Sequence, residues 1–288
     1  MLMMRPTKRP LRRQRLAATA GLGGALLLIA ASTVAGQPPQ AGQSGIYEQM
    51  RRLLNVRHSS GQNVHPVFEG WERNPDGTAS LYWGYMNRNW AEALDIPVGP
   101  DNHFTPGPAD QGQPTHFLPR RVKQLFKVVV PGDFEGEYVW TLSIRGRPAS
   151  VPGSLKPAQM IDVRKSSSNE NTAPQLTPGP ALTLAFPASA ALAVGVTDDG
   201  LPAPRPGAAS GLGVRWSKYR GPGEVTFEPA ESPVEDGRAV TTATVSEPGR
   251  YTLAALADDG SYYGTAQGQG VPGFACCWTF GFIEVSYE

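Results

Sequence analysis

Glycine and proline set the strongest limit on what this chain can fold into. The sequence contains 33 glycines and 28 prolines among 288 residues, which leaves little room for long helices. These turn-forming residues separate short runs that are rich in Val, Thr, Tyr and Trp, and in which apolar and polar residues alternate. The pattern predicts an all-β protein built from short antiparallel strands.

The first 36 residues have the features of a signal peptide. A basic segment that ends at Arg15 precedes an apolar run over 16–31 and the small residues of 33–35. We expect cleavage after Ala35 or Gly36. An uncleaved N-terminal anchor stays open as an alternative, because the apolar run is near the lower length limit for a membrane span.

The same segment predicts where the protein goes. Arg12-Arg13 is a pair that the Tat route uses, but Arg15 is unusual in such a signal, so the Sec and Tat routes both stay open. No later stretch is apolar enough to cross a membrane as a helix, so we expect no transmembrane segment after signal cleavage. The expected location is the periplasm or the cell exterior.

Net charge argues against one class of partner. Six of the 26 basic residues lie in the first 35 positions, which contain no acidic residue, so the rest of the chain has 20 basic against 25 acidic residues, or a net charge of −5. An acidic exported chain without a basic stripe is not expected to bind nucleic acid.

Composition divides the chain into five parts. A polar, proline-rich stretch without hydrophobic periodicity interrupts the strand pattern in the middle of the chain. Near the N-terminus, 46–57 has a stripe of apolar residues at helical spacing, which predicts a short amphipathic helix. The expected parts are a signal peptide (1–36), a leader with the short helix (37–63), β-sandwich domain 1 (64–165), a Pro-rich linker (166–180) and β-sandwich domain 2 (181–288).

Two aromatic residues define the expected fold of domain 2. Trp216 lies at the centre of the run GVRWSKYRGPG, where an immunoglobulin-like sandwich has its core tryptophan. Tyr251 follows Glu247-Pro248-Gly249-Arg250, which resembles the turn into a tyrosine corner, where the phenol bonds back to the backbone. With TTATVSEPGRYTLAALADDG, these residues resemble the PKD-like and related immunoglobulin-like modules of bacterial exported proteins. The resemblance implies a sandwich without the usual core disulfide.

Domain 1 is expected to have a similar architecture. VFEGWERNPDGTASLYWGYMNRN predicts a hairpin that turns at Asn74–Gly77. Tyr138 and Trp140 repeat the Gly-x-Tyr pattern of domain 2 and are expected to be structural. The stretch from EGWERNPDG to YVWTL resembles a domain without assigned activity that recurs in exported proteins of environmental bacteria. The fold class is therefore predicted as two immunoglobulin-like antiparallel β-sandwich domains in tandem.

Two copies of Asp-Asp-Gly suggest a cation site in domain 2. Each copy ends an expected strand, and the loops that follow those strands meet at one pole of an immunoglobulin-like sandwich. Crowded carboxylate oxygens suit Ca²⁺. The alternative is ordinary turn chemistry, in which Asp side chains bond their own backbone, and the sequence favours that alternative. The candidate ligands are Asp198, Asp199, Asp258 and Asp259.

The chain's two cysteines, Cys276 and Cys277, are adjacent and enter the last expected strand from that pole. Three states stay open: a vicinal disulfide, two reduced thiols of which one is buried, and an intermolecular bridge. Alternation along the strand places Cys277 in phase with Ile283 and Val285, which predicts an inward side chain. A vicinal ring makes a rigid turn, so these cysteines are expected to stiffen a loop pole and not a core.

Aromatic residues crowd into the first hairpin and suggest a glycan-binding surface. Sugars stack on exposed aromatic rings, so the candidates for ligand contact are Trp71, Trp83, Tyr85 and Trp90. One face of the hairpin must fill the core, however, and in a small sandwich such residues are more often buried.

An enzyme is not the expected function, and no catalytic residue is assigned. The four histidines, at positions 58, 65, 103 and 116, have no metal-binding spacing, and no nucleophile elbow occurs. A pair of His116 and Asp110 in the 99–120 loop is the one arrangement that favours a hydrolase.

The sequence therefore predicts an exported, non-enzymatic binding or structural protein, adhesive in character, with an unknown protein or glycan partner at the cell envelope. A polysaccharide-binding protein that uses the domain 1 aromatics is the alternative, and a hydrolase is the third. No cofactor is expected apart from the Ca²⁺ considered above.

Overall fold

The computed structural model describes residues 57–161, 170–201, 211–260 and 277–288. Within it, Val56–Glu288 form one compact unit, separate from Met1–Asn55. The predicted signal peptide and the short helix lie outside the described residues. Among the described residues, no helix is long and apolar enough to cross a membrane.

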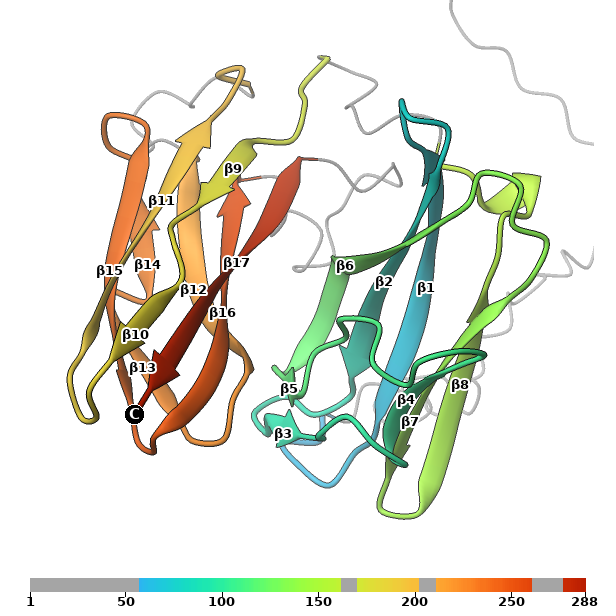
Figure 1. Ribbon diagram of the computed structural model, residues 1–288, viewed down its shortest axis with the longest axis horizontal. Coiled ribbons are helices and arrows are strands. Elements are labelled where there is room, and N and C mark those ends of the chain that lie inside the picture. The colour runs from blue at the N-terminus through green and yellow to red at the C-terminus, as the bar shows by residue number, and fades with distance from the viewer. Residues whose placement is uncertain (1–56, 162–169, 202–210, 261–276) are drawn as a thin grey trace, which may run out of the picture. The chain divides into compact units, whose positions relative to one another are not determined.

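The described chain is all-β, as the spacing of its turn residues predicts (Figure 1). Its one helical element is a single 3-10 turn, η1 (Pro157–Gln159). The strands of the N-terminal half are β1 (Val64–Arg73), β2 (Ala79–Asn87), β3 (Leu94–Asp95), β4 (Asn102–Thr105), β5 (His116–Phe117), β6 (Arg120–Val130), β7 (Tyr138–Ile144) and β8 (Arg147–Gly153). The strands of the C-terminal half are β9 (Gln175–Pro178), β10 (Leu182–Leu184), β11 (Ala190–Thr197), β12 (Gly213–Arg220), β13 (Val225–Glu228), β14 (Glu231–Pro233), β15 (Arg238–Val245), β16 (Gly249–Asp258) and β17 (Trp278–Tyr287).

The N-terminal half contains two three-stranded antiparallel sheets, in the orders β1-β2-β6 and β4-β7-β8, with a short β3-β5 pair. The first hairpin turns where the sequence predicts, because Gly77 N–H donates to the carbonyl of Asn74 at 3.0 Å. The core between the sheets is aromatic. The Phe104 ring of β4 stacks on Trp140 of β7 at 5.7 Å and meets the edge of Trp83 of β2 at 5.1 Å.

The C-terminal half has the strand order of an immunoglobulin-like sandwich. Its two sheets run β10-β17-β16-β12-β14 and β13-β15-β11-β9, and all pairs are antiparallel except β10 with β17. This order corresponds to strands A-B-E-D in one sheet and C-F-G in the other. The β15 side chains alternate strictly between buried and exposed, because one face of the strand covers the core and the other faces solvent.

The predicted linker differs from the structure at its C-terminal end. Residues 175–178, which the sequence assigns to the Pro-rich linker, form β9 and pair with β11. This strand can contain Pro178 because it lies at the edge of its sheet. The outer side of an edge strand has no neighbouring strand, so the N–H group that proline lacks costs no hydrogen bond there.

The 99–120 stretch, expected as one long ordered loop, contains two short strands. Phe104 of β4 and Phe117 of β5 are buried and hold the stretch against the core, whereas Leu118 is exposed. Asn102 Nδ2 ties the loop together by donating to the carbonyls of Ile96 at 2.9 Å and Pro114 at 2.8 Å.

Candidate functional site

Most of the predicted aromatic surface is core. Trp71, Trp83 and Tyr85 are buried, so these three residues cannot form a stacking platform, and the burial that the sequence favours is found instead. Trp71 and Tyr85 also use their polar atoms internally: Trp71 Nε1 donates to the carbonyl of Lys156 at 2.9 Å, and Tyr85 OH accepts from Leu118 N–H at 2.8 Å. The large apolar rings fill the space between two small sheets, which smaller side chains would leave empty.

Trp90, the fourth candidate, lies beyond the end of β2 and is 41% exposed. The guanidinium carbons of Arg57 and Arg120 each lie 4.2 Å from the centre of its ring. The structure therefore leaves one aromatic side chain of the predicted set at the surface, between cations.

The four aspartates predicted for calcium are engaged by the protein. Asp199 Oδ2 accepts from the backbone N–H and the hydroxyl of Thr172, at 2.8 and 2.6 Å. Asp259 Oδ2 accepts from the Asn171 amide at 2.8 Å, and Asp258 Oδ2 pairs with Arg215 at 2.8 Å. Asp198 Oδ2 accepts from the Gly200 N–H at 2.9 Å, which is the turn chemistry that the sequence favours.

The two acidic tripeptides are nonetheless close enough to interact. Burial raises the pKa of Asp198, and the charges of Asp199 and Asp259 raise it further. In the described part of the chain, no three His, Cys, Asp or Glu side chains are grouped to hold a metal ion. Calcium binding by these residues stays a prediction.

Cys277 is buried, as its phase predicts, and has a φ of 106°. Its sulfur lies 3.4 Å from the carbonyl oxygen of Asn171, and the residue takes part in a disulfide bond. Cys276 lies outside the described residues, so the vicinal ring stays a prediction.

His116 pairs with a different carboxylate from the one predicted. Its Nδ1 lies 2.9 Å from Asp95 Oδ1, and the same oxygen lies 3.0 Å from the Nζ of Lys218 on β12. Asp110, the predicted partner, pairs with Arg220 instead. Asp95 lies directly beside His116 in the β3-β5 pair, a proximity that only strand pairing creates.

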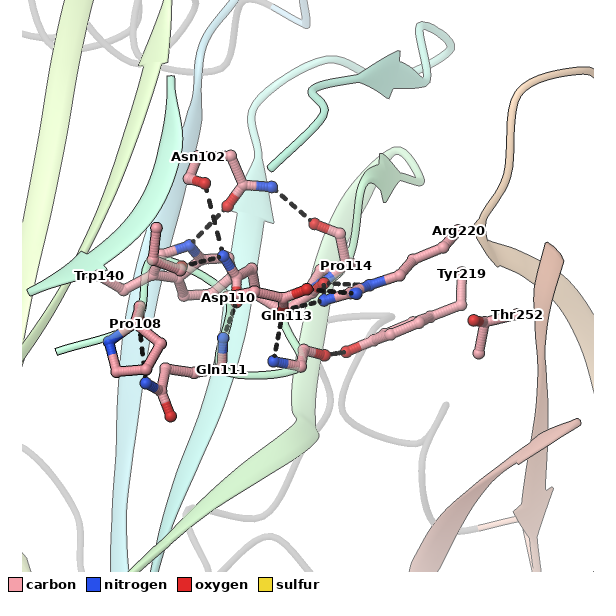
Figure 2. A network of polar contacts seen from close by, with 12 residues as sticks. Asn102, Pro108, Asp110, Gln111, Gln113, Pro114, Trp140, Tyr219, Arg220 and Thr252 are labelled. Atoms are coloured by element: carbon pink, nitrogen blue, oxygen red, sulfur yellow. Dashed lines mark hydrogen bonds and ion pairs between the residues drawn. The ribbon is translucent and has the colours of Figure 1, made fainter. Parts of the chain in front are cut away.

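Asp110 belongs to a polar network that joins the 99–120 stretch to β12 (Figure 2). Both carboxylate oxygens accept from Arg220, at 2.7 and 3.0 Å, and Arg220 Nε donates to the carbonyl of Gln113 at 2.8 Å. This ion pair lowers the pKa of Asp110. A bidentate guanidinium–carboxylate pair fixes geometry better than a single contact does.

Tyr219 extends the same network. Its hydroxyl donates to the carbonyl of Gly112, its carbonyl accepts from Thr115 N–H at 3.1 Å, and its ring lies 4.5 Å from that of Phe282. Burial raises the pKa of this phenol well above its ordinary value. Tyr219 is part of the same hydrophobic cluster as the core of the N-terminal half. We name the contacts of Asp110, Gln113, Tyr219 and Arg220 the junction.

The junction residues carry little signal in the sequence. Alternation along β12 places Lys218 and Arg220 in phase with Trp216, and Tyr219 on the opposite face. Nothing local in the sequence indicates that the 99–120 stretch covers that opposite face. A bulge between Lys218 and Arg220 also interrupts the alternation at the end of the strand.

A hollow of about 420 Å³ lies beside the Asp95–His116 pair, lined chiefly by residues 94–101 and 143–145. Ser143 is a potential nucleophile in its lining. Among the described residues, Ser143 Oγ forms no hydrogen bond with His116, whose Nδ1 contacts Asp95. Ser143 and His116 therefore do not form the nucleophile–base contact that acyl transfer needs.

The residues predicted as structural lie in or against the cores. Trp216 is buried on β12 and donates from Nε1 to Ser232 Oγ at 2.9 Å. Tyr251 OH donates to the carbonyl of Glu247 at 2.7 Å, which is the geometry of a tyrosine corner. Trp140 donates to Asn102 Oδ1 at 3.0 Å, and Tyr138 is half-buried against Phe134.

Comparison with known proteins returns only distant structural matches. No protein-family model and no curated protein matches the chain. A titin–obscurin-like 1 immunoglobulin complex is 14% identical over 41% of this chain and 95% of that chain, with a TM-score of 0.24. A chimeric titin that carries a decorin peptide is 12% identical over 80% and 99%, with a TM-score of 0.25. A protein of unknown function from Porphyromonas gingivalis is 8% identical over 77% and 99%, with a TM-score of 0.23.

Structural matches with TM-scores this low support no conclusion about this chain. The assignment of an immunoglobulin-like fold to the C-terminal half rests on its strand order, on Trp216 in the third strand and on the Tyr251 corner. The narrower resemblances, to PKD-like modules and to the recurring N-terminal domain, stay predictions.

Proposed function

We propose that this chain is an exported, non-enzymatic binding or structural protein that acts as an adhesive module at the bacterial envelope or outside the cell. The observation that carries the proposal is the junction, which links Asp110 and Gln113 of the N-terminal half to Tyr219 and Arg220 of β12. Two sandwiches joined in this way form a rigid support for their surface loops. A rigid support suits a protein that binds a partner or holds other parts of an assembly at a fixed distance.

The chemistry of the junction supports a mechanical role. Arg220 is held by both oxygens of Asp110 and by a backbone carbonyl, so its charge and its fork of donors are used internally. Tyr219 is buried and carries a hydroxyl bonded to Gly112. Such groups orient elements and are not available for proton transfer to a substrate.

Export is tested by producing the full chain with a C-terminal tag in a bacterial host and measuring its mass in each cell fraction. We expect a periplasmic or secreted product that begins at Gly36 or Gln37. Retention of the uncleaved chain in the cytoplasm would contradict export.

Binding is tested with the exported product by pulldown from envelope extracts alongside a glycan array. The matched control is an Asp110→Asn/Arg220→Gln variant, which lacks the junction ion pair but retains the surface loops. Capture of one partner that excess untagged protein abolishes supports a binding role. Turnover of a chromogenic ester or glycoside panel by the wild-type protein would contradict a non-enzymatic one.

A polysaccharide-binding protein is the second candidate. The observation that favours it is the exposed Trp90 between Arg57 and Arg120, although the other predicted aromatics are buried.

A further inference from the structure

Three segments of the N-terminal half meet around Trp90. Its backbone N–H donates to the carbonyl of His58 at 2.9 Å, and the next residue, Ala91, donates to the carbonyl of Ser59 at 2.9 Å. From the first residue of β6, Arg120 Nη1 reaches the carbonyl of Arg88 at 3.4 Å. Backbone contacts therefore hold the exposed indole and the arginines around it in one place.

Two of these arginines use the indole as a support. The guanidinium carbons of Arg57 and Arg120 both lie 4.2 Å from the ring centre, so they are at most twice that distance apart. A guanidinium that stacks on an indole is attracted by the ring quadrupole and keeps its N–H donors around its own edge. The indole ring therefore fixes the positions of two guanidinium groups and uses none of their N–H donors.

The charge of this surface is not neutralised within the described part of the chain. None of the ion pairs there involves Arg57, Arg88 or Arg120, and the nearby Glu92 pairs with Arg145 at 2.9 Å. Burial lowers the pKa of His65, and the charge of Arg88 lowers it further, as expected next to a net positive surface.

We propose that Arg57, Trp90 and Arg120 form a binding site for an acidic polysaccharide, a glycan chain that carries carboxylate or sulfate groups. Arginine forks bind such anions through paired N–H donors. A local group of cations in a chain with a net charge of −5 beyond residue 35 fits a glycan better than a nucleic acid, which needs an extended basic track. The inference deepens the second candidate function.

The test uses the full chain, purified, with dextran sulfate and polygalacturonate as acidic probes and dextran as the neutral probe. We expect both acidic probes to bind and dextran not to bind. The double variant Arg57→Gln/Arg120→Gln should lose roughly tenfold or more in affinity, since two charge-assisted contacts are removed. Trp90→Leu should weaken binding less, because it removes the support but leaves the charges.

Arg147→Gln is the matched control, because Arg147 is an exposed arginine on the β7–β8 hairpin that forms no ion pair among the described residues. Its affinity should equal that of the wild type. The arginine variants should have melting temperatures close to that of the wild type, because the altered arginines form no ion pair in that part of the chain.

Three results would overturn the proposal: equal affinity in the Arg57/Arg120 double variant, binding of dextran as tight as that of dextran sulfate, and tighter binding of single-stranded DNA of matched charge. An absence of binding to both acidic probes would also overturn it. The export and pulldown outcomes do not depend on these probes, so failure here is distinguishable from failure of the broader function.

Discussion

At the scale of the residue, the Tyr251 corner depends on a glycine. Gly221 has a φ of 142°, and a Cβ built on it would lie 2.1 Å from Cδ1 of the Tyr251 ring. The ring cannot move away without giving up its bonds to Glu247 and Gly223, at 2.7 and 3.1 Å. Both backbone conformation and space therefore require glycine at this position.

Replacing Gly221 with alanine should lower the free energy of unfolding by about 3 kcal/mol or more, because overpacking adds to the strain of a positive φ. The measurement is urea denaturation at neutral pH. Gly146→Ala is the control: its φ is 71°, and nothing lies within 4 Å of its added Cβ, so only about 1 kcal/mol of backbone strain is expected. Equal losses in the two variants would contradict the steric account of Gly221.

Burial determines which of the candidate aromatic residues can contact a ligand. Alternation along the hairpin indicates that Trp83 and Tyr85 share a face, but it does not say which face meets a second sheet. Packing against Phe104 and Trp140 made that face the core. Trp90 lies beyond the strand, where alternation gives no information.

At the scale of the element, the junction makes the contact between the 99–120 stretch and β12 sensitive to acid. Arg220 lowers the pKa of Asp110, so the folded protein favours the ionised form. The ion pair stabilises the protein at pH values above the unfolded pKa of about 3.9. That stabilisation is lost as the pH falls through the lower, folded-state pKa.

Asp110→Asn should therefore lower the free energy of unfolding at about pH 7 by up to about 1 kcal/mol, as expected for a half-exposed pair in screening solvent. The deficit should shrink towards zero by about pH 2, where the wild-type carboxylate is protonated. Denaturation curves across this range measure it. Asp133→Asn, an exposed aspartate without an ion pair among the described residues, should show no pH-dependent deficit.

Secondary structure was predictable where alternation is regular and was missed where an edge or a bulge intervenes. β15 follows directly from AVTTATVS, since every second residue is buried. The turn EPG predicts where β16 begins, although the second half of β16 is buried on both faces. β9 was assigned to the linker because an edge strand of four residues that ends in proline has no sequence pattern distinct from a loop. The pairing of Asp95 with His116 depends on a two-residue ladder that no periodicity reveals.

At the scale of the whole molecule, the two halves share a hydrophobic cluster. Tyr219 and Ala254 of the C-terminal half belong to the core cluster of the N-terminal half, with Phe280 and Phe282 packed against it. Apolar area shared in this way couples the unfolding of the two halves, because neither can unfold without exposing part of the other's core.

The wild-type protein should therefore unfold in one cooperative transition, and Tyr219→Ala should separate it into two. Differential scanning calorimetry, with the calorimetric enthalpy compared with the van't Hoff enthalpy, measures the change. Val214→Ala is the control, because Val214 is buried within the C-terminal core alone. It should lower the melting temperature and leave a single transition. Two transitions in the wild type would contradict the coupling.

The sequence by itself determined the class of fold, the immunoglobulin-like character of the C-terminal half and the positions of Trp216 and Tyr251 in it. These features follow from local rules of alternation, turn chemistry and short motifs, which act over a few residues. Only the tertiary structure decided that Asp110 pairs with Arg220, that Asp95 meets His116 and that Trp90 stays at the surface beside Arg57 and Arg120. Those contacts join residues that are distant in the chain, and which partners meet depends on how the sheets and loops pack together.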